Sequence, residues 1–277
     1  MSLFSVAQMN SQNDIEANLH VIKFKMQQAK NQSAELIVFP ENFICFAAGQ
    51  QRQTAELFES IQQRLQTLAH HYQIWMIAGT LPCPYRPDGS TIKDGRVRTV
   101  SLCISPEGKT IARYDKIHLF DVQVADGIGG YQESAVFEAG DALTVAKTPF
   151  GNIGLMVCYD LRFPELALKL RAQGSHILTA PSAFTFTTGQ MHWQLLLQAR
   201  AIDSQCMVLG AAQQGWHANG TRHTWGHAMA TQSQGKILAE VTDEGHQLIV
   251  VPFDLEIQAQ IRTAMPLITH RKLIDLS

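Results

Sequence analysis

The sequence predicts an α/β fold in which helices cover sheets of buried strands. Segments with apolar residues at helical spacing alternate along the chain with short, wholly apolar runs, and the second half repeats this order. Of the 277 residues, 45% are hydrophobic and 17% are charged, so the chain can bury a large core. No linker rich in Pro, Gly or Ser divides the halves, and we therefore expect residues 1–277 to form a single domain.

The first half begins with a helix and a buried strand. Apolar residues recur at helical spacing over residues 13–29, and Asn13 followed by Glu16 is typical of a capping box at the helix start. Residues 36–39, ended by Pro40, form a short and wholly apolar run. Such a run favours a strand that is covered on both faces.

The next segments continue the alternation. Residues 54–70 predict a helix whose inward face carries Leu57, Ile61, Leu65 and Leu68, and residues 74–78 predict a second buried strand. Residues 97–105 and 110–114 alternate between apolar and polar around the turn residues 106–108. This pattern indicates a β-hairpin.

The second half contains the same kinds of element. We expect a hairpin of residues 143–148 and 152–157, then a helix from Pro164 to Gln173 closed by Gly174, and a strand at 176–180. A helix at 191–204 and a strand at 207–211 follow. The last expected elements are strands at 227–231, 236–240 and 248–253 and a helix at 254–264 that Pro266 stops. Residues 35–43 (ELIVFPENF) and 176–184 (HILTAPSAF) share a strand, a Pro and a Phe. Internal duplication is one explanation of this likeness, and chance similarity is the alternative.

Composition and charge argue against several classes of protein. The 22 Lys and Arg balance 24 Asp and Glu without a run of like charges, so binding to nucleic acid or to an anionic membrane is not expected. No apolar stretch is long enough to cross a bilayer and the start lacks the pattern of a signal peptide, so we expect a cytoplasmic protein. The five cysteines include no CxxC pair, which argues against a disulfide framework and a structural zinc site.

Three polar residues at the ends of predicted strands are candidates for chemistry. Glu41 follows Pro40 at the carboxyl end of an apolar strand, where a partly dry environment raises a carboxyl pKa and suits it to general-base work. Lys116 follows a hairpin strand, and a desolvated cation there stabilises an oxyanion. Taken singly, Glu41 is also consistent with an exposed residue at a strand end. Lys116 is also consistent with a surface lysine that pairs with Asp115 or Asp121.

Cys158 is the third candidate. Apolar residues run directly into Cys158, and a polar turn and a helix with Pro164 near its start follow. A thiol at a strand-to-helix turn near a helix N-terminus has a lowered pKa and is exposed at the top of the sheet. A buried structural cysteine is the alternative.

The segments around these three residues, FPENF, YDKIHLFD and GLMVCYDLRFPEL, resemble in their order the Glu, Lys and Cys segments of the nitrilase, or carbon-nitrogen hydrolase, superfamily. The start SVAQMN, the segment YQES with Glu133, and PSAFTFTTGQMHWQLLLQARAIDSQ are similar to family landmarks, so the resemblance covers nearly the whole chain. It implies a four-layer αββα sandwich, a homodimer, and no metal or organic cofactor.

The resemblance also implies the site residues. Cys158 is expected to attack an amide carbon, with Glu41 as base to the thiol and then as acid to the departing amine. Lys116 and the backbone N–H of Tyr159 are expected to hold the oxyanion, and Glu133 to position Lys116 and the substrate. Glu133 also fits an ordinary loop carboxylate.

The segments CYDLRF and AFTFTTGQMHW look most like the Nit branch of the superfamily, whose small-molecule substrates are deaminated glutathione or, for the ω-amidases, α-ketoglutaramate. Both amides carry a free α-carboxylate, which an arginine binds with two parallel hydrogen bonds, and Arg162 is the candidate. Its alternative is a structural arginine paired with Asp160 or Glu165. Phe184 and Thr188 are expected to flank the acyl chain. We expect deaminated glutathione as the substrate, with α-ketoglutaramate as the alternative.

Other classes have weaker support. A zinc site built from His217, His223 and His227 lacks an HExxH motif or a cysteine pair, and no GxSxG or phosphate-binding glycine motif is present. A catalytically silent interaction protein of the same fold is the remaining alternative. The glycine-rich residues 122–132 are expected to form a loop over the site, on the amine side of the substrate.

Overall fold

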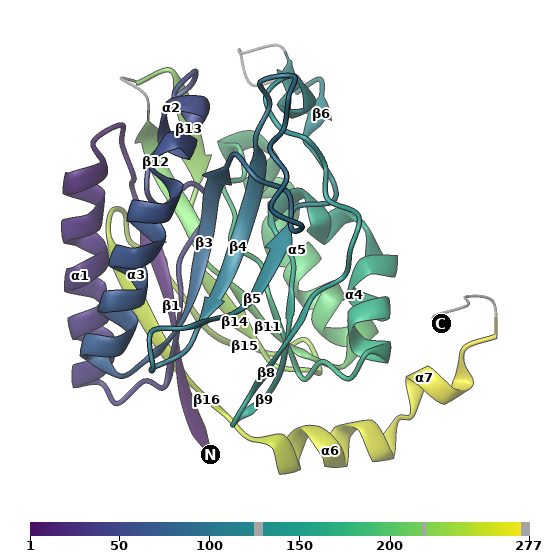
Figure 1. Cartoon of the computed structure of the whole chain (residues 1–277). Coiled ribbons are helices and arrows are strands. Elements are labelled where there is room, and N and C mark those ends of the chain that lie inside the picture. The colour runs from purple at the N-terminus through teal and green to yellow at the C-terminus, as the bar shows by residue number, and fades with distance from the viewer. Residues whose placement is uncertain (125–129, 218–219, 273–277) are drawn as a thin grey trace.

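Two β-sheets pack face to face, and helices cover their outer faces (Figure 1). The computed structural model describes residues 1–124, 130–217 and 220–272. Helices α1 (Ile15–Asn31) and α3 (Phe58–Tyr72) lie on the outer face of the first sheet, and α4 (Pro164–Ala172) and α5 (Phe186–Ser204) on that of the second. This order of layers confirms the predicted αββα fold.

The first sheet has the strand order β13-β12-β1-β2-β3-β4-β5, with β16 paired with β1. The pairs of β1 with β2 and β12, and of β2 with β3, are parallel, and the others are antiparallel. Its strands are β1 (Ser2–Met9), β2 (Leu36–Val38), β3 (Trp75–Cys83), β4 (Arg98–Ile104), β5 (Thr110–Asp115), β12 (Ala212–His217), β13 (Arg222–Trp225) and β16 (Gln247–Phe253).

The second sheet has the order β15-β14-β11-β10-β9-β8. Its strands are β8 (Val145–Thr148), β9 (Gly151–Leu155), β10 (Ile177–Thr179), β11 (Met207–Gly210), β14 (Met229–Thr231) and β15 (Ile237–Glu240). The smaller elements are α2 (Gln51–Glu56), a ribbon of β6 (Asp121–Val122) and β7 (Tyr131–Gln132), and the 3₁₀ helices η1 (Glu133–Ala135) and η2 (Cys158–Arg162). Helices α6 (Leu255–Ala264) and α7 (Leu267–His270) lie below the sheets in the view of Figure 1, and Gln258 and Arg262 of α6 donate hydrogen bonds to the carbonyls of His176 and Ser175.

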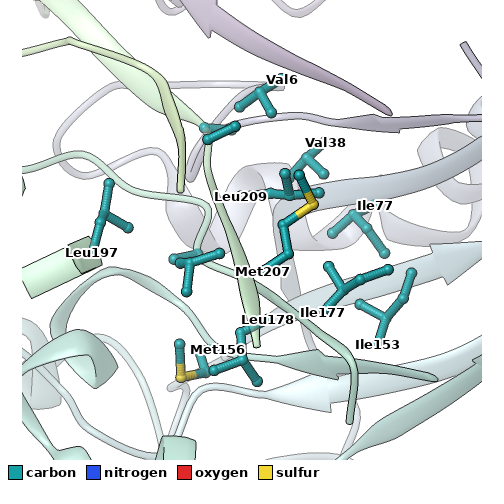
Figure 2. Packing of buried hydrophobic residues seen from close by; sticks show 14 of the residues in the cluster. Val6, Val38, Ile77, Ile153, Met156, Ile177, Leu178, Leu197, Met207 and Leu209 are labelled. Carbon is teal, nitrogen blue, oxygen red and sulfur yellow. The ribbon is translucent and has the colours of Figure 1, made fainter. Parts of the chain in front are cut away.

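The core between the sheets joins side chains of β1, β2 and β3 to side chains of β9, β10 and β11. Figure 2 labels several of them, among them Val6, Val38, Ile77, Ile153, Ile177 and Leu209. Neighbouring residues on the same first-sheet strands, such as Ile37 and Met76, pack instead with α1 and α3. Strand β2 and the start of β3 are therefore buried on both faces, as the apolar runs at residues 36–39 and 74–78 predict.

The structure corrects three predicted details of the helices. Asp14, and not Asn13, caps α1, because its side chain accepts the Ala17 N–H at 3.0 Å. The helix predicted over residues 54–70 is two helices that meet at Leu57, and that side chain is 46% exposed instead of turned inward. Helix α5 begins at Phe186, before the predicted residue 191, because Thr185 caps its N-terminus.

Three strands of the first sheet, β1, β12 and β13, were not predicted from the sequence. The two similar nine-residue segments occupy matching places, since one forms β2 in the first sheet and the other forms β10 in the second. Both segments lead into the same pocket, where Glu41 and Phe184 lie.

Candidate active site

A pocket of about 390 Å³ opens where strands of the two sheets end. All eight residues predicted from the sequence to act in the site line this pocket: Glu41, Lys116, Glu133, Cys158, Tyr159, Arg162, Phe184 and Thr188. A cavity of this size is in the range that holds small-molecule ligands.

Cys158 occupies a strained turn between β9 and α4. Its φ is +48°, a left-handed conformation that is uncommon for a residue with a side chain. The Cys158 N–H donates to the carbonyl of Pro181 at 2.9 Å, which ties the turn to the neighbouring strand-end loop. The turn therefore holds the thiol at the pocket wall, but Cys158 is only 9% exposed, so the predicted exposure at the top of the sheet is wrong.

Asp160 holds the Cys158 turn in place through hydrogen bonds to its buried carboxylate. Its fully buried carboxylate accepts hydrogen bonds from the Tyr114 hydroxyl at 2.7 Å and from the Val157 N–H at 2.8 Å. It also lies 2.6 Å from Nδ1 of His118, whose ring stacks on Phe163 at 3.7 Å. The sequence did not predict this network.

Glu41 reaches the pocket from a tight turn at the end of β2. Gly79 allows the backbone of β3 to lie close to this turn, since a Cβ at position 79 would lie 1.8 Å from the carbonyl oxygen of Pro40. The Gln213 side-chain amide donates to the backbone carbonyl of Glu41 at 2.9 Å, and the Asn42 N–H donates to Thr80 Oγ1 at 2.8 Å. Glu41 is only 5% exposed, so the alternative interpretation of an exposed residue at a strand end is wrong.

Lys116 lies between two carboxylates. Its Nζ donates to Glu41 Oε1 at 2.9 Å and to both carboxylate oxygens of Glu133 at 2.9 Å. Glu133 also accepts the Phe120 N–H at 2.6 Å. The alternative partner Asp115 pairs with Arg113 at 2.7 Å instead. Lys116 is therefore a buried cation that joins the two glutamates.

Burial and these charges set the protonation of the site. Burial alone lowers the pKa of Lys116, but the carboxylates of Glu133 and Glu41 raise it well above its usual value. Burial raises the pKa of Glu133, an effect that Lys116 opposes. Burial and the nearby Glu41 raise the pKa of Cys158 well above that of a free thiol, although Lys116 opposes them. The prediction of a lowered thiol pKa is therefore wrong.

Arg162 lies among aromatic side chains on the same wall as Cys158. Its guanidinium carbon is 5.3 Å from the ring centre of Phe184 and 5.9 Å from that of Tyr159, and Nη1 lies 3.3 Å from His192 Nδ1. Neither Asp160 nor Glu165 forms an ion pair with it among the described residues. Its positive charge is thus available to the pocket. Thr188 is held at the start of α5, where its N–H donates to Thr185 Oγ1.

Three further residues of the pocket wall were missed. Arg222 on β13 lies 4.5 Å from the ring centre of Tyr131 and 5.4 Å from that of Phe46. Tyr131 belongs to the loop that the sequence placed over the site, but Phe46 and Arg222 come from segments without a clear local pattern, and folding brings the three together. The middle of the glycine-rich loop predicted over the site, residues 125–129, lies outside the described residues.

The three histidines considered for zinc do not form a metal site. The ring of His217 contacts the carbonyl of Ser11 and Thr224 Oγ1, both at 2.7 Å, and His227 pairs with Glu240 at 2.7 Å. Within residues 1–124, 130–217 and 220–272, no group of His, Cys, Asp and Glu is arranged to hold a metal ion. The helices of these same segments include none that is long and apolar enough to cross a membrane.

Comparison with known proteins agrees with this geometry. The sequence profile of the family described as Carbon-nitrogen hydrolase matches residues 3–263. A deaminated glutathione amidase of Yersinia enterocolitica is 40% identical over 274 residues, which are 98% of this chain and 93% of that protein. A deaminated glutathione amidase of Synechocystis sp. is 38% identical over 273 residues, which are 97% of each chain.

A solved structure extends the comparison to the fold. The crystal structure of Saccharomyces cerevisiae Nit3, described as a member of branch 10 of the nitrilase superfamily, has a TM-score of 0.83 and 29% sequence identity to this chain. The match covers 96% of this chain and 94% of that one. The layers, and not only the motifs around the pocket, are thus shared.

Proposed function

The chain belongs to the carbon-nitrogen hydrolase family, and from this premise we propose that it hydrolyses a carboxylate-bearing amide through an acyl-enzyme on Cys158. The observation that carries the proposal is the cluster of Glu41, Lys116 and Cys158 in one pocket, with Lys116 bonded to Glu41 at 2.9 Å. A thiol, a base and a buried cation are the groups that acyl transfer requires.

The first half-reaction forms a thioester. Glu41 takes the proton of Cys158 as the sulfur bonds to the amide carbon, and the carbonyl oxygen becomes negatively charged. Lys116 and the backbone N–H of Tyr159 stabilise this oxyanion; the N–H lies in the first turn of η2, where N–H groups lack partners inside the helix. When the C–N bond breaks, Glu41 gives its proton to the departing amine.

The second half-reaction releases the acid. Glu41 takes a proton from water, the hydroxide attacks the thioester carbon, and the same donors stabilise the second oxyanion. The C–S bond then breaks, and the proton on Glu41 returns to the sulfur of Cys158. Glu133 holds Lys116 in place throughout, since both of its carboxylate oxygens contact Nζ.

The proposed substrate is deaminated glutathione, in agreement with the activity named for the two relatives. Its 2-oxo acid carboxylate suits the guanidinium of Arg162, and Phe184 and Thr188 flank the acyl chain from the same wall. The alternative, α-ketoglutaramate, carries the same acyl group but releases only ammonia. Both amides therefore use these three contacts, and they differ on the amine side.

Steady-state kinetics on both amides test this proposal. We expect a higher kcat/KM for deaminated glutathione than for α-ketoglutaramate, and substrate should protect Cys158 from alkylation. An equal or better kcat/KM for α-ketoglutaramate would make the chain an ω-amidase. Turnover of neither amide, with no protection of Cys158, would favour a catalytically silent protein of this fold.

We further propose that residues 1–277 form one domain and that two copies form a homodimer. Helix α5 supports the dimer, because its outer side exposes Met191, Leu195 and Ile202, and Leu195 is 65% exposed. The cysteines are free thiols, which suits a reducing cytoplasm. Sedimentation of the wild type against Leu195→Glu tests the dimer: a monomeric wild type would contradict it, and a monomeric variant would locate the interface.

A further inference from the structure

The pocket holds more positive charge than the proposed chemistry uses. Among the described residues that line it, three are cations and two are anions. Lys116 is committed to both glutamates, and Arg162 is assigned to the 2-oxo acid carboxylate. The proposed mechanism assigns no role to Arg222.

The surroundings of Arg222 prepare it to bind an anion. Among the described residues, no carboxylate forms an ion pair with its half-exposed guanidinium, and its buried Nε has no hydrogen-bond acceptor. The ring of Tyr131 lies 4.5 Å from the guanidinium carbon and that of Phe46 lies 5.4 Å away. Aromatic faces stabilise a guanidinium and restrict its orientation, so the planar donor group is held in place.

Arg222 and Arg162 contact different aromatic side chains of the pocket. Arg162 lies over Tyr159 and Phe184, which follow the nucleophile and the β10 strand. Arg222 lies over Phe46, which follows Glu41 by five residues, and over Tyr131, which precedes Glu133 by two. Because Glu41 protonates the departing amine in the proposed mechanism, the Arg222 side is the side of the amine.

We infer that Arg222 binds the terminal carboxylate of a peptide leaving group and so selects a peptide amide over a primary amide. This inference rests on the proposed function and deepens it, since deaminated glutathione has one carboxylate on its acyl part and another on the amine that is released. The two uncommitted guanidinium groups match these two anions. A guanidinium binds a carboxylate with two parallel hydrogen bonds, which a lysine in its place does not reproduce.

The test combines three substrates with variants of Arg222. The substrates are deaminated glutathione, the same compound with its glycine carboxylate converted to an amide, and α-ketoglutaramate. We expect Arg222→Met to lower kcat/KM for deaminated glutathione by about 10- to 100-fold, the range for a hydrogen bond to a charged group, and Arg222→Lys to recover only part of it. On the amidated peptide and on α-ketoglutaramate, Arg222→Met should equal the wild type.

Controls separate the possible failures. Arg64→Met removes an exposed arginine on α3 and should change none of the three rates. An equal loss on all three substrates with Arg222→Met would assign Arg222 a structural role and overturn the inference, while the proposed function stands. A wild type that accepts the amidated peptide as well as the acid would also overturn it. A wild type that hydrolyses none of the three substrates would overturn the proposed function, and the inference with it.

Discussion

Lys116→Met should lower the free energy of unfolding by about 3–5 kcal/mol at pH 8, which is the usual cost of leaving a buried charge without its partner. The substitution removes the cation that lies 2.9 Å from Glu41 and from Glu133, and it leaves two buried carboxylates beside each other. A typical domain is stabilised by only about 5–15 kcal/mol, so the loss is large enough to measure.

The loss should depend on pH in a defined direction. Burial raises the pKa of Glu133 and Lys116 lowers it, so removing Lys116 raises that pKa further. The folded variant then holds a proton that the unfolded chain releases above a pKa of about 4.3. Stability therefore falls as pH rises from this unfolded pKa through the folded one, at up to about 1.4 kcal/mol per pH unit, or up to about 4 kcal/mol between pH 5 and 8 for one proton.

Urea unfolding followed by tryptophan fluorescence, at one protein concentration and at each pH unit from 5 to 8, measures this dependence. The wild type should show a shallower slope because Lys116 offsets the burial of Glu133. Lys116→Met combined with Glu133→Gln should recover much of the loss at pH 8, and the exposed Lys147→Met is the matched control. A loss that is the same at pH 5 and pH 8, and that Glu133→Gln does not reduce, would refute this reasoning.

Three further variants test the assigned roles. Cys158→Ala should abolish turnover and shift the thermal midpoint by no more than a few degrees, whereas Cys103→Ala, in the core, should retain turnover; a second essential cysteine would contradict the assignment. Glu41→Gln should prevent acylation because an amide accepts no proton from the thiol, and intact-protein mass spectrometry showing normal acyl-enzyme would disprove that role. Arg162→Met should lower kcat/KM for carboxylate-bearing amides, at a cost of about 1.5–3 kcal/mol in transition-state binding, and Arg162→Lys should not restore it. Hydrolysis of a neutral aliphatic amide should be unaffected. An equal loss on all amides would rule out carboxylate binding by Arg162.

The layered fold was predictable where burial leaves a local signal. Strands β2 and β10 are buried, so apart from Thr179 their sequences are apolar, and Pro40 and Pro181 follow them closely. Strand β1 was missed because Ser5 and Gln8 interrupt its apolar pattern. Both side chains are fully buried, and their acceptors are the carbonyls of Leu36 and Asp243, far away in the sequence. Local periodicity contains no information about such partners.

The same limit applies to the pocket. Glu41, Lys116 and Cys158 were found because each follows a strand and because three segments together resemble one family. Arg222 has no such local mark, and its importance depends on the rings of Phe46 and Tyr131, which folding brings to it. The direction of the Cys158 pKa was wrong for a related reason: a turn near a helix start lowers a thiol pKa, but burial and the Glu41 charge are stronger here.

A raised thiol pKa fits the proposed mechanism, since it makes the base necessary. A thiol that keeps its proton at neutral pH attacks only as that proton moves to Glu41, and this transfer removes one of the two anions that Lys116 contacts. The oxyanion of the substrate forms in the same step, so Lys116 exchanges one negative partner for another and the net charge of the pocket is unchanged. Charge that only changes position beside a fixed, buried cation requires little reorganisation of its surroundings. Glu133 remains ionised on the other side of Lys116 and keeps the ammonium group in place while this exchange occurs.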